Sequence, residues 1–189
     1  PDQRRDFDTA WDSLNDSRVD ADGIGFVFTD EVLIVGVDLD NCRDPDSGDI
    51  EDWAADIIDR FDSYTEISPS GTGVHILVGG ELPPGGNRKG QVEMYDSDRY
   101  FTVTGAHVEG TPTEVRKCQR TIDAVHREFI VYGRGAHEKS LPDGQTDLDV
   151  SAGGDTAGNR DTDASVRQSA SSLIERYGDD FTSIREPAV

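Results

Sequence analysis

The sequence predicts an α+β domain in which helices flank a mixed or antiparallel sheet. Short runs of β-branched and aromatic residues lie between turn signals, which is typical of strands. Two longer segments repeat their apolar residues at helical spacing, which is typical of amphipathic helices. After a short first helix, the expected order is β-β-α-β-β-β-β-α, and this mixture of strands and helices favours the α+β class.

The first part of the chain is expected to supply one helix and two strands. Residues 7–15 predict a short helix, and the turn signal DADG follows at 20–23. Residues 23–30 alternate apolar and smaller side chains, and residues 31–42 are rich in β-branched residues, so both predict strands. Because only a short turn separates these two segments, we expect them to pair with each other as a hairpin.

The middle of the chain predicts a second helix and two more strands. Residues 50–63 place their apolar side chains on one helical face. Residues 64–68 and 74–78 predict strands, and a tight glycine-bearing loop joins them at 69–73. Residues 79–90 are mostly glycine, proline and polar residues and predict a loop. The inward face of the helix is expected to consist of Ile50, Trp53, Ile57, Ile58 and Phe61.

The last strands and the last helix of the domain follow this loop. Residues 91–96 and 99–105 predict two strands, which we expect to pair across Ser97 and Asp98. Residues 113–132 predict a helix with one apolar face. Its inward residues are expected to be Val115, Cys118, Ile122, Val125 and Phe129.

Composition divides the chain into three parts. Residues 1–133 hold the apolar runs and are expected to form one domain, N-terminally truncated because the chain lacks an initiator Met. Residues 134–164 are rich in Gly, Asp, Ser and Thr, which cannot offset the entropy of ordering by burial, so they predict a disordered acidic linker. Residues 165–189 are expected to be an isolated helix or tail.

The chain is strongly acidic, with a formal net charge of -21 over 189 residues and only three lysines. Such a surface keeps a protein soluble by self-repulsion and argues against general nucleic-acid binding, although it leaves room for a local basic groove. It is similar to the bias of proteins from salt-loving archaea; the alternative is an ordinary acidic cytosolic protein. Two cysteines and the absence of a long apolar run favour a reducing, cytoplasmic location with no membrane partner.

The first chemical signal is VGVDLD at 35–40. Residues two apart on a strand share a face, so Asp38 and Asp40 project together, roughly 7 Å apart, while their apolar neighbours face the core. Hard carboxylate oxygens of this kind suit divalent cations. Gly36 lies on the same face and is expected to leave room for a ligand. The alternative is a pair of solvent-facing aspartates at a strand end.

The second signal is SPSGTGVHIL at 68–77. The backbone N–H groups of the loop Ser70, Gly71, Thr72 and Gly73 are candidates to face phosphate oxygens. His75 follows on a strand, where its imidazole can donate to a triphosphate. The Walker phosphate-binding pattern does not occur. The alternative is a hairpin turn followed by a partly buried structural histidine.

The third signal is QVEMYDSDRYFTVTG at 91–105. If the apolar residues of its first strand face the core, Glu93 faces the ligand side and completes a carboxylate triad with Asp38 and Asp40. Asp96 has the opposite parity, although a twist at the strand end would bring it into reach, so the sequence favours Glu93 over Asp96. The alternative for either is an acid exposed to water at a turn.

Three cations accompany these acids. Arg88 and Lys89 lie in the loop before Glu93, and Arg99 begins the strand after it. Arginine suits bidentate phosphate contacts and lysine suits a point-charge contact, so all three are candidates for nucleotide binding. The alternative for each is a solvated surface cation.

In this order, VGVDLD, SGTGVHI and VEMYD resemble the motifs of the archaeo-eukaryotic primase superfamily. With the extension RYFTVTG, the pattern over about residues 20–132 is similar to the primase-polymerase domains of phages, plasmids and haloarchaeal mobile elements. The resemblance implies an RRM-like sheet and template-directed nucleotide addition with Mg²⁺ or Mn²⁺ by a two-metal mechanism. It also implies nucleoside triphosphates, a single-stranded DNA template with primer, and a helicase, here encoded separately, as partners.

The same resemblance implies a role for each matching residue. Asp38 and Asp40 match the metal ligands of the first motif, and His75 matches the histidine that contacts the nucleotide's phosphates. Glu93 matches the acid of the third motif, where many relatives have Asp. Two alternatives remain: an inactive or partner-dependent remnant that binds nucleotide or DNA, and a metal-dependent nuclease.

Overall fold

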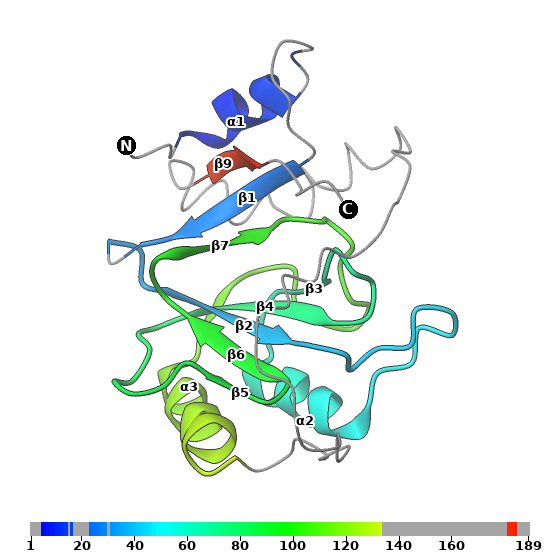
Figure 1. Ribbon diagram of the computed structural model, residues 1–189, viewed down its shortest axis with the longest axis vertical. Coiled ribbons are helices and arrows are strands. Elements are labelled where there is room, and N and C mark those ends of the chain that lie inside the picture. The colour runs from blue at the N-terminus through cyan, green and yellow to red at the C-terminus, as the bar shows by residue number, and fades with distance from the viewer. Residues whose placement is uncertain (1–4, 15, 17–22, 30, 134–180, 185–189) are drawn as a thin grey trace, which may run out of the picture.

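A computed structural model of the chain describes residues 5–14, 16, 23–29, 31–133 and 181–184. Within these residues the chain forms two antiparallel-rich sheets and three α-helices, so the predicted α+β class is confirmed (Figure 1). In the part of the chain that the structure describes, every helix is too short or too polar to cross a bilayer.

The larger sheet contains the segments that carry the predicted motifs. Its strand order is β3-β4-β2-β6-β5, and each neighbouring pair along this path is antiparallel. One further strand, β8, pairs in parallel with β4. The strands are β2 (Ile34–Leu39), β3 (Thr65–Ile67), β4 (Val74–Gly79), β5 (Arg88–Lys89), β6 (Val92–Tyr95) and β8 (Arg116–Lys117).

The smaller sheet has the order β7-β1-β9 and is antiparallel throughout. Its strands are β1 (Gly23–Phe28), β7 (Arg99–Thr102) and β9 (Phe181–Ile184). Figure 1 shows this sheet above the larger one, with helix α1 (Phe7–Leu14) beyond it. The pairing of residues 181–184 with β1 brings together two segments that lie far apart in the sequence.

Helices α2 (Asp52–Phe61) and α3 (Gln119–Val125) cover the opposite face of the larger sheet (Figure 1). A π-helical segment, η1 (His126–Val131), continues α3. Alternate residues of the central strand β2, Val35, Val37 and Leu39, are fully buried against these helices. The intervening residues of β2 therefore face the smaller sheet.

A second hydrophobic core lies between the two sheets. Leu77 and Tyr95 of the larger sheet are buried here together with Phe28, Phe101 and Val103. The ring of Phe101 packs edge-on against that of Phe28, with centroids 4.9 Å apart. The central strands are therefore covered on both faces, which is why β2 and β4 read as nearly continuous apolar runs.

Two strand pairings predicted from the sequence are wrong. Residues 23–30 and 31–42 do not form a hairpin, because β1 pairs with β7 and β9 while β2 pairs with β4 and β6. Residues 91–96 and 99–105 do not pair either, because the chain leaves the larger sheet after β6 and enters the smaller one as β7. Each short turn connects two sheets, which allows the aromatic residues on both sides to bury against each other.

Smaller differences concern element ends. The α-helix predicted at 113–132 begins at Gln119, since residues 116–117 pair with β4 instead. The loop predicted at 79–90 contains the short strand β5. The linker expected at 134–164 and the helix expected after it, up to residue 180, lie outside the described residues, and the division of the chain at 133 stays a prediction.

Candidate active site

One row of ionisable residues crosses the whole larger sheet. The strand register pairs Glu66 with His75, His75 with Asp38, Asp38 with Glu93, and Glu93 with Arg88. Paired residues on neighbouring strands share a face, and this is the face opposite α2 and α3. Three separately predicted motifs therefore meet in one line, with Asp38 at its centre.

Asp38 and Asp40 lie where β2 emerges from the core. The Asp38 side chain is 21% exposed, and its Oδ1 atom is buried without a hydrogen-bond partner among the described residues. Burial, together with the negative charges of Asp40 and Glu93, raises the pKa of Asp38 to about 8. Burial and Glu93 also raise the pKa of Asp40, against the opposing charge of Arg88. These carboxyl groups repel one another, and the nearby arginines offset the shifts only in part.

Asp40 is held at the row by its backbone. Its amide donates to the carbonyl of Gln91 at 2.9 Å, and the side-chain amide of Gln91 donates back to the Asp40 carbonyl at 3.0 Å. These bonds fasten the end of β2 to the start of β6. These bonds keep Asp40 close to Asp38, whose pKa its charge helps to raise.

His75 lies between two acids. Its Nε2 atom is 3.9 Å from Oδ1 of Asp38, and its Nδ1 atom is 4.0 Å from Oε1 of Glu66. The ring stacks on Phe101 with centroids 4.3 Å apart and an interplanar angle of 20°. Burial lowers the pKa of His75 to about 4, and the backbone of Thr102 opposes this only in part. At neutral pH the ring is uncharged, so its approach to Asp38 is not an ion pair.

Glu93 completes the row on the other side of Asp38. Arg88 contacts it through Nε at 2.8 Å from Oε1, and the hydroxyl of Tyr95 donates to Oε2. The guanidinium of Arg99 lies over the Tyr95 ring, 4.8 Å from its centroid. Glu93 itself is 7% exposed. The structure thus brings Arg88 directly, and Arg99 through Tyr95, to the predicted acid.

The third acid of the group is Glu93 rather than Asp96. Asp96 turns toward the loop after β4, where its Oδ2 accepts a hydrogen bond from the amide of Leu82 at 3.1 Å. Glu93 is the register partner of Asp38 and acts on the pKa of both Asp38 and Asp40. The structure therefore places Glu93, and not Asp96, beside Asp38, while the role of Glu93 as the third acid stays a prediction.

The loop Ser70 to Gly73 lies against the end of β2. A Cβ atom on Gly73 would come within 2.6 Å of the Leu39 carbonyl oxygen, so only glycine permits this close approach. The hydroxyls of Ser70 and Thr72 are 3.0 Å apart. The Gly71 amide donates to the carbonyl of Ser68 and the Thr72 amide contacts Ser70 Oγ, so the turn itself uses both. The hydroxyl of Ser70 is also 3.1 Å from that of Ser68, so the hydroxyl groups of this loop contact one another.

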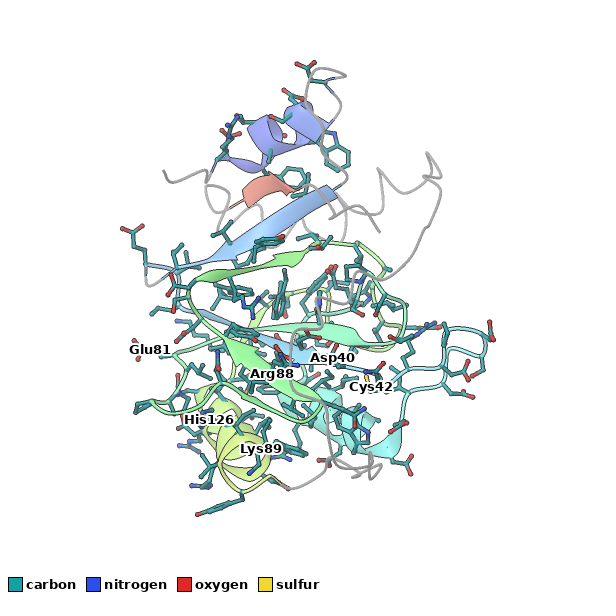
Figure 2. All side chains as sticks on the ribbon, viewed as in Figure 1. Asp40, Cys42, Glu81, Arg88, Lys89 and His126 are labelled. Carbon is teal, nitrogen blue, oxygen red and sulfur yellow. The ribbon has the colours of Figure 1, made fainter. Side chains whose placement is uncertain are left out.

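Lys89 is not brought to the row. It has the opposite parity to Arg88 on β5 and therefore points to the helical face of the sheet. A Cβ atom on Gly133 would meet the Lys89 side chain at 2.6 Å, which places that side chain beside the end of η1. Figure 2 labels both residues and draws Lys89 on the side of α3. Its predicted nucleotide contact stays a prediction that this arrangement does not support.

The space expected beside Gly36 is filled. A Cβ atom at this position would lie 2.3 Å from the Phe28 ring and 2.6 Å from that of Phe101. The glycine therefore admits aromatic rings from the smaller sheet, and not a ligand. The expectation of room for a ligand at Gly36 is wrong because the facing sheet was not predictable from local pattern.

Two members of the site were missed. Glu66 is 2% exposed and ends the row on β3, and Tyr95 holds Glu93 from the same strand. Strand alternation could have indicated Glu66. If the strands on either side of the glycine-bearing turn pair with each other, Glu66 lies opposite His75. Nothing in the local sequence indicated that this acid would be buried.

Among the described residues, no three His, Cys, Asp and Glu side chains are grouped so as to hold a metal ion by themselves. Asp38 and Asp40 form a two-carboxylate pair, and the third acid is engaged by Arg88 and Tyr95. A two-carboxylate set is incomplete for an all-protein metal cage but is sufficient when substrate phosphates supply further oxygens.

Comparison with known proteins gives one informative relative. No family model matches the chain. The chain is 37% identical over 112 residues to the DNA primase-polymerase of Nitratiruptor phage NrS-1, an alignment that covers 53% of this chain. The chain spans only 16% of that relative's length. Over about half of its residues, the chain is thus related in sequence to a DNA primase-polymerase, which supports the family resemblance of its three motifs.

Proposed function

We propose that this chain carries the catalytic core of a DNA primase-polymerase, which adds nucleotides to a primer as a DNA template directs, in replication of a mobile element or chromosome. The observation that carries the proposal is the row in which Asp38 lies between His75 and Glu93, with Asp40 at the end of the same strand. The sequence similarity to a phage protein named as a DNA primase-polymerase supports the same class of reaction.

The residues present fit a divalent cation such as Mg²⁺ or Mn²⁺. Asp38 has a buried oxygen without a hydrogen-bond partner among the described residues, and its pKa is raised partly by the other acids. A cation would relieve that repulsion. Mg²⁺ is commonly bound by one or two carboxylates together with substrate phosphates, which matches the pair Asp38 and Asp40. Glu93 would join them as the third acid.

The bound ions would lower the pKa of the primer 3′-hydroxyl and neutralise the triphosphate and the leaving pyrophosphate. The chain's own residues hold and orient the reactants. His75 presents Nε2 on the Asp38 side, where it would face the triphosphate. Arg88 and Arg99 supply positive charge beside Glu93, and the Ser70 and Thr72 hydroxyls offer donors near Asp40. Positioning and electrostatics supply most of the rate.

The test compares three variants in primer extension on a defined template with Mn²⁺. Asp38→Asn and Glu93→Gln keep the shape of each side chain but remove its charge, and each is expected to reduce templated incorporation at least ~100-fold. Asp96→Asn is the matched control, because Asp96 serves the Leu82 amide and an amide oxygen can still accept that bond. The proposal fails if Asp38→Asn extends primers as well as the unaltered chain.

The same preparation separates the alternatives. A nuclease would cleave labelled single strands with Mn²⁺ in the absence of nucleotides. A binding remnant would bind a triphosphate without metal-dependent turnover. Either result with the unaltered chain would replace the proposed function.

A further inference from the structure

Glu66 is a buried carboxyl group that the proposed chemistry does not use. Its Oε2 accepts a hydrogen bond from the hydroxyl of Tyr64 at 2.7 Å and from the Gly105 amide at 3.1 Å. Its Oε1 accepts from the Thr104 amide at 3.1 Å. Burying a carboxyl group is costly unless such donors satisfy it. Three donors from two segments therefore fix this carboxyl group in one place and one orientation.

The fixed carboxyl group faces the imidazole of His75. The two residues are register partners, and Oε1 of Glu66 is 4.0 Å from Nδ1 of His75. Nδ1 is buried and has no hydrogen-bond partner among the described residues. The separation is about 1 Å longer than a hydrogen bond, and such contacts often tighten only when substrate binds.

Packing restricts the orientation of the His75 ring. Phe101 stacks on the imidazole and fixes its plane. The remaining freedom is which nitrogen carries the proton and which way round the ring lies. The groups that decide this are Glu66 on one side, Asp38 on the other at 3.9 Å from Nε2, and the backbone of Thr102, which acts on the ring as a competing acceptor.

We propose that Glu66 is a positioning residue for His75: it accepts a hydrogen bond from the Nδ1–H group of the ring and thereby directs Nε2 toward Asp38 and the nucleotide. A carboxylate behind an imidazole fixes its tautomer and increases the basicity of the far nitrogen. In the neutral ring Nε2 then carries no proton and is a hydrogen-bond acceptor on the Asp38 side. The orientation of Nε2 toward a nucleotide rests on the proposed function, whereas the tautomer does not.

The competing explanation is purely structural. Glu66 also braces the turn at residues 104–105, where Gly105 has a positive φ of 69°. A role in holding this turn would affect folding but would not decide which nitrogen of His75 carries the proton. The tautomer of the imidazole is therefore the quantity that distinguishes the two roles.

The direct test is ¹⁵N NMR of the full chain labelled at histidine, without metal or nucleotide. The His75 signals are identified by their loss in His75→Asn. We expect the proton on Nδ1 in the unaltered chain. In Glu66→Gln, the amide oxygen can keep the Tyr64 and Gly105 bonds, while the NH₂ group replaces Oε1, loses the bond from the Thr104 amide and donates to Nδ1. The proton of the ring should then move to Nε2. Tyr64→Phe removes one bond to Glu66 but leaves Oε1 in place, and should not change the tautomer.

The proposal is overturned if the proton resides on Nε2 in the unaltered chain, or if Glu66→Gln leaves the tautomer unchanged. If Glu66→Gln does not fold, the tautomer of the unaltered chain decides alone. Only a ring with its proton on Nδ1 places a hydrogen-bond donor opposite Glu66.

Discussion

The burial of Asp38, together with the carboxyl groups around it, predicts a stability that falls as pH rises. The pKa of Asp38 is about 8 in the folded chain against an ordinary value of 3.8. The folded state therefore binds this proton more tightly than the unfolded state. Stability is greatest below about pH 4, decreases between these two values, and changes no further through this group above about pH 8.

The size of the effect follows from the shift. Between pH 5 and pH 8, three pH units within the shifted range correspond to roughly 4 kcal/mol, which is an upper limit. Titration of Asp38 is coupled to Asp40 and Glu93, so the realised change is about 2–4 kcal/mol. Asp38→Asn removes the titrating group, and the difference between the two proteins isolates it from other groups, including His75, whose lowered pKa acts in the opposite direction.

Urea unfolding followed by tryptophan fluorescence measures this difference. With EDTA present at pH 5, 6.5 and 8, Asp38→Asn should gain stability relative to the unaltered chain as pH rises. Adding Mn²⁺ at pH 8 should stabilise the unaltered chain and leave the variant nearly unchanged. A stability difference that does not vary with pH would refute the reasoning.

Two further predictions concern the surroundings of the row. Gly36→Ala forces a methyl group into the rings of Phe28 and Phe101, and should destabilise the fold by about 1–3 kcal/mol in thermal unfolding; an unchanged melting temperature would contradict the packing between the sheets. Arg88→Ala removes the cation beside Glu93 and should weaken nucleotide binding in a titration with dATP about tenfold, whereas Lys89→Ala should have little effect because that side chain lies on the helical face. Equal effects of the two substitutions would contradict this assignment of faces.

Strand alternation was sufficient to predict which residues share a face. Asp38 and Asp40 lie on the face away from α2 and α3, and Glu93 has the matching parity on β6, as expected. The same rule distinguishes Arg88 from Lys89 once residues 88–89 are known to form a strand, but glycines, prolines and polar residues around them predicted a loop.

Strand partners were not predictable in the same way. The alternation of apolar residues predicts that Phe28 and Phe101 lie on the buried face of their strands, but it does not predict which sheet each strand joins. Both short turns that looked like hairpins connect different sheets, since burying these rings between two layers outweighs local pairing. The burial of Glu66 has the same origin, because two of its three donors come from residues 104–105, nearly forty positions away in the chain.

The row on the larger sheet is proposed to bind divalent cations together with a nucleoside triphosphate. The most direct measurement is anomalous X-ray scattering from crystals of the chain soaked with Mn²⁺ and dATP. We predict a manganese peak at the carboxyl groups of Asp38 and Asp40, with the triphosphate on the His75 side. Manganese bound only elsewhere, with the Asp38 and Asp40 carboxyl groups contacting neither metal nor phosphate, would contradict the account.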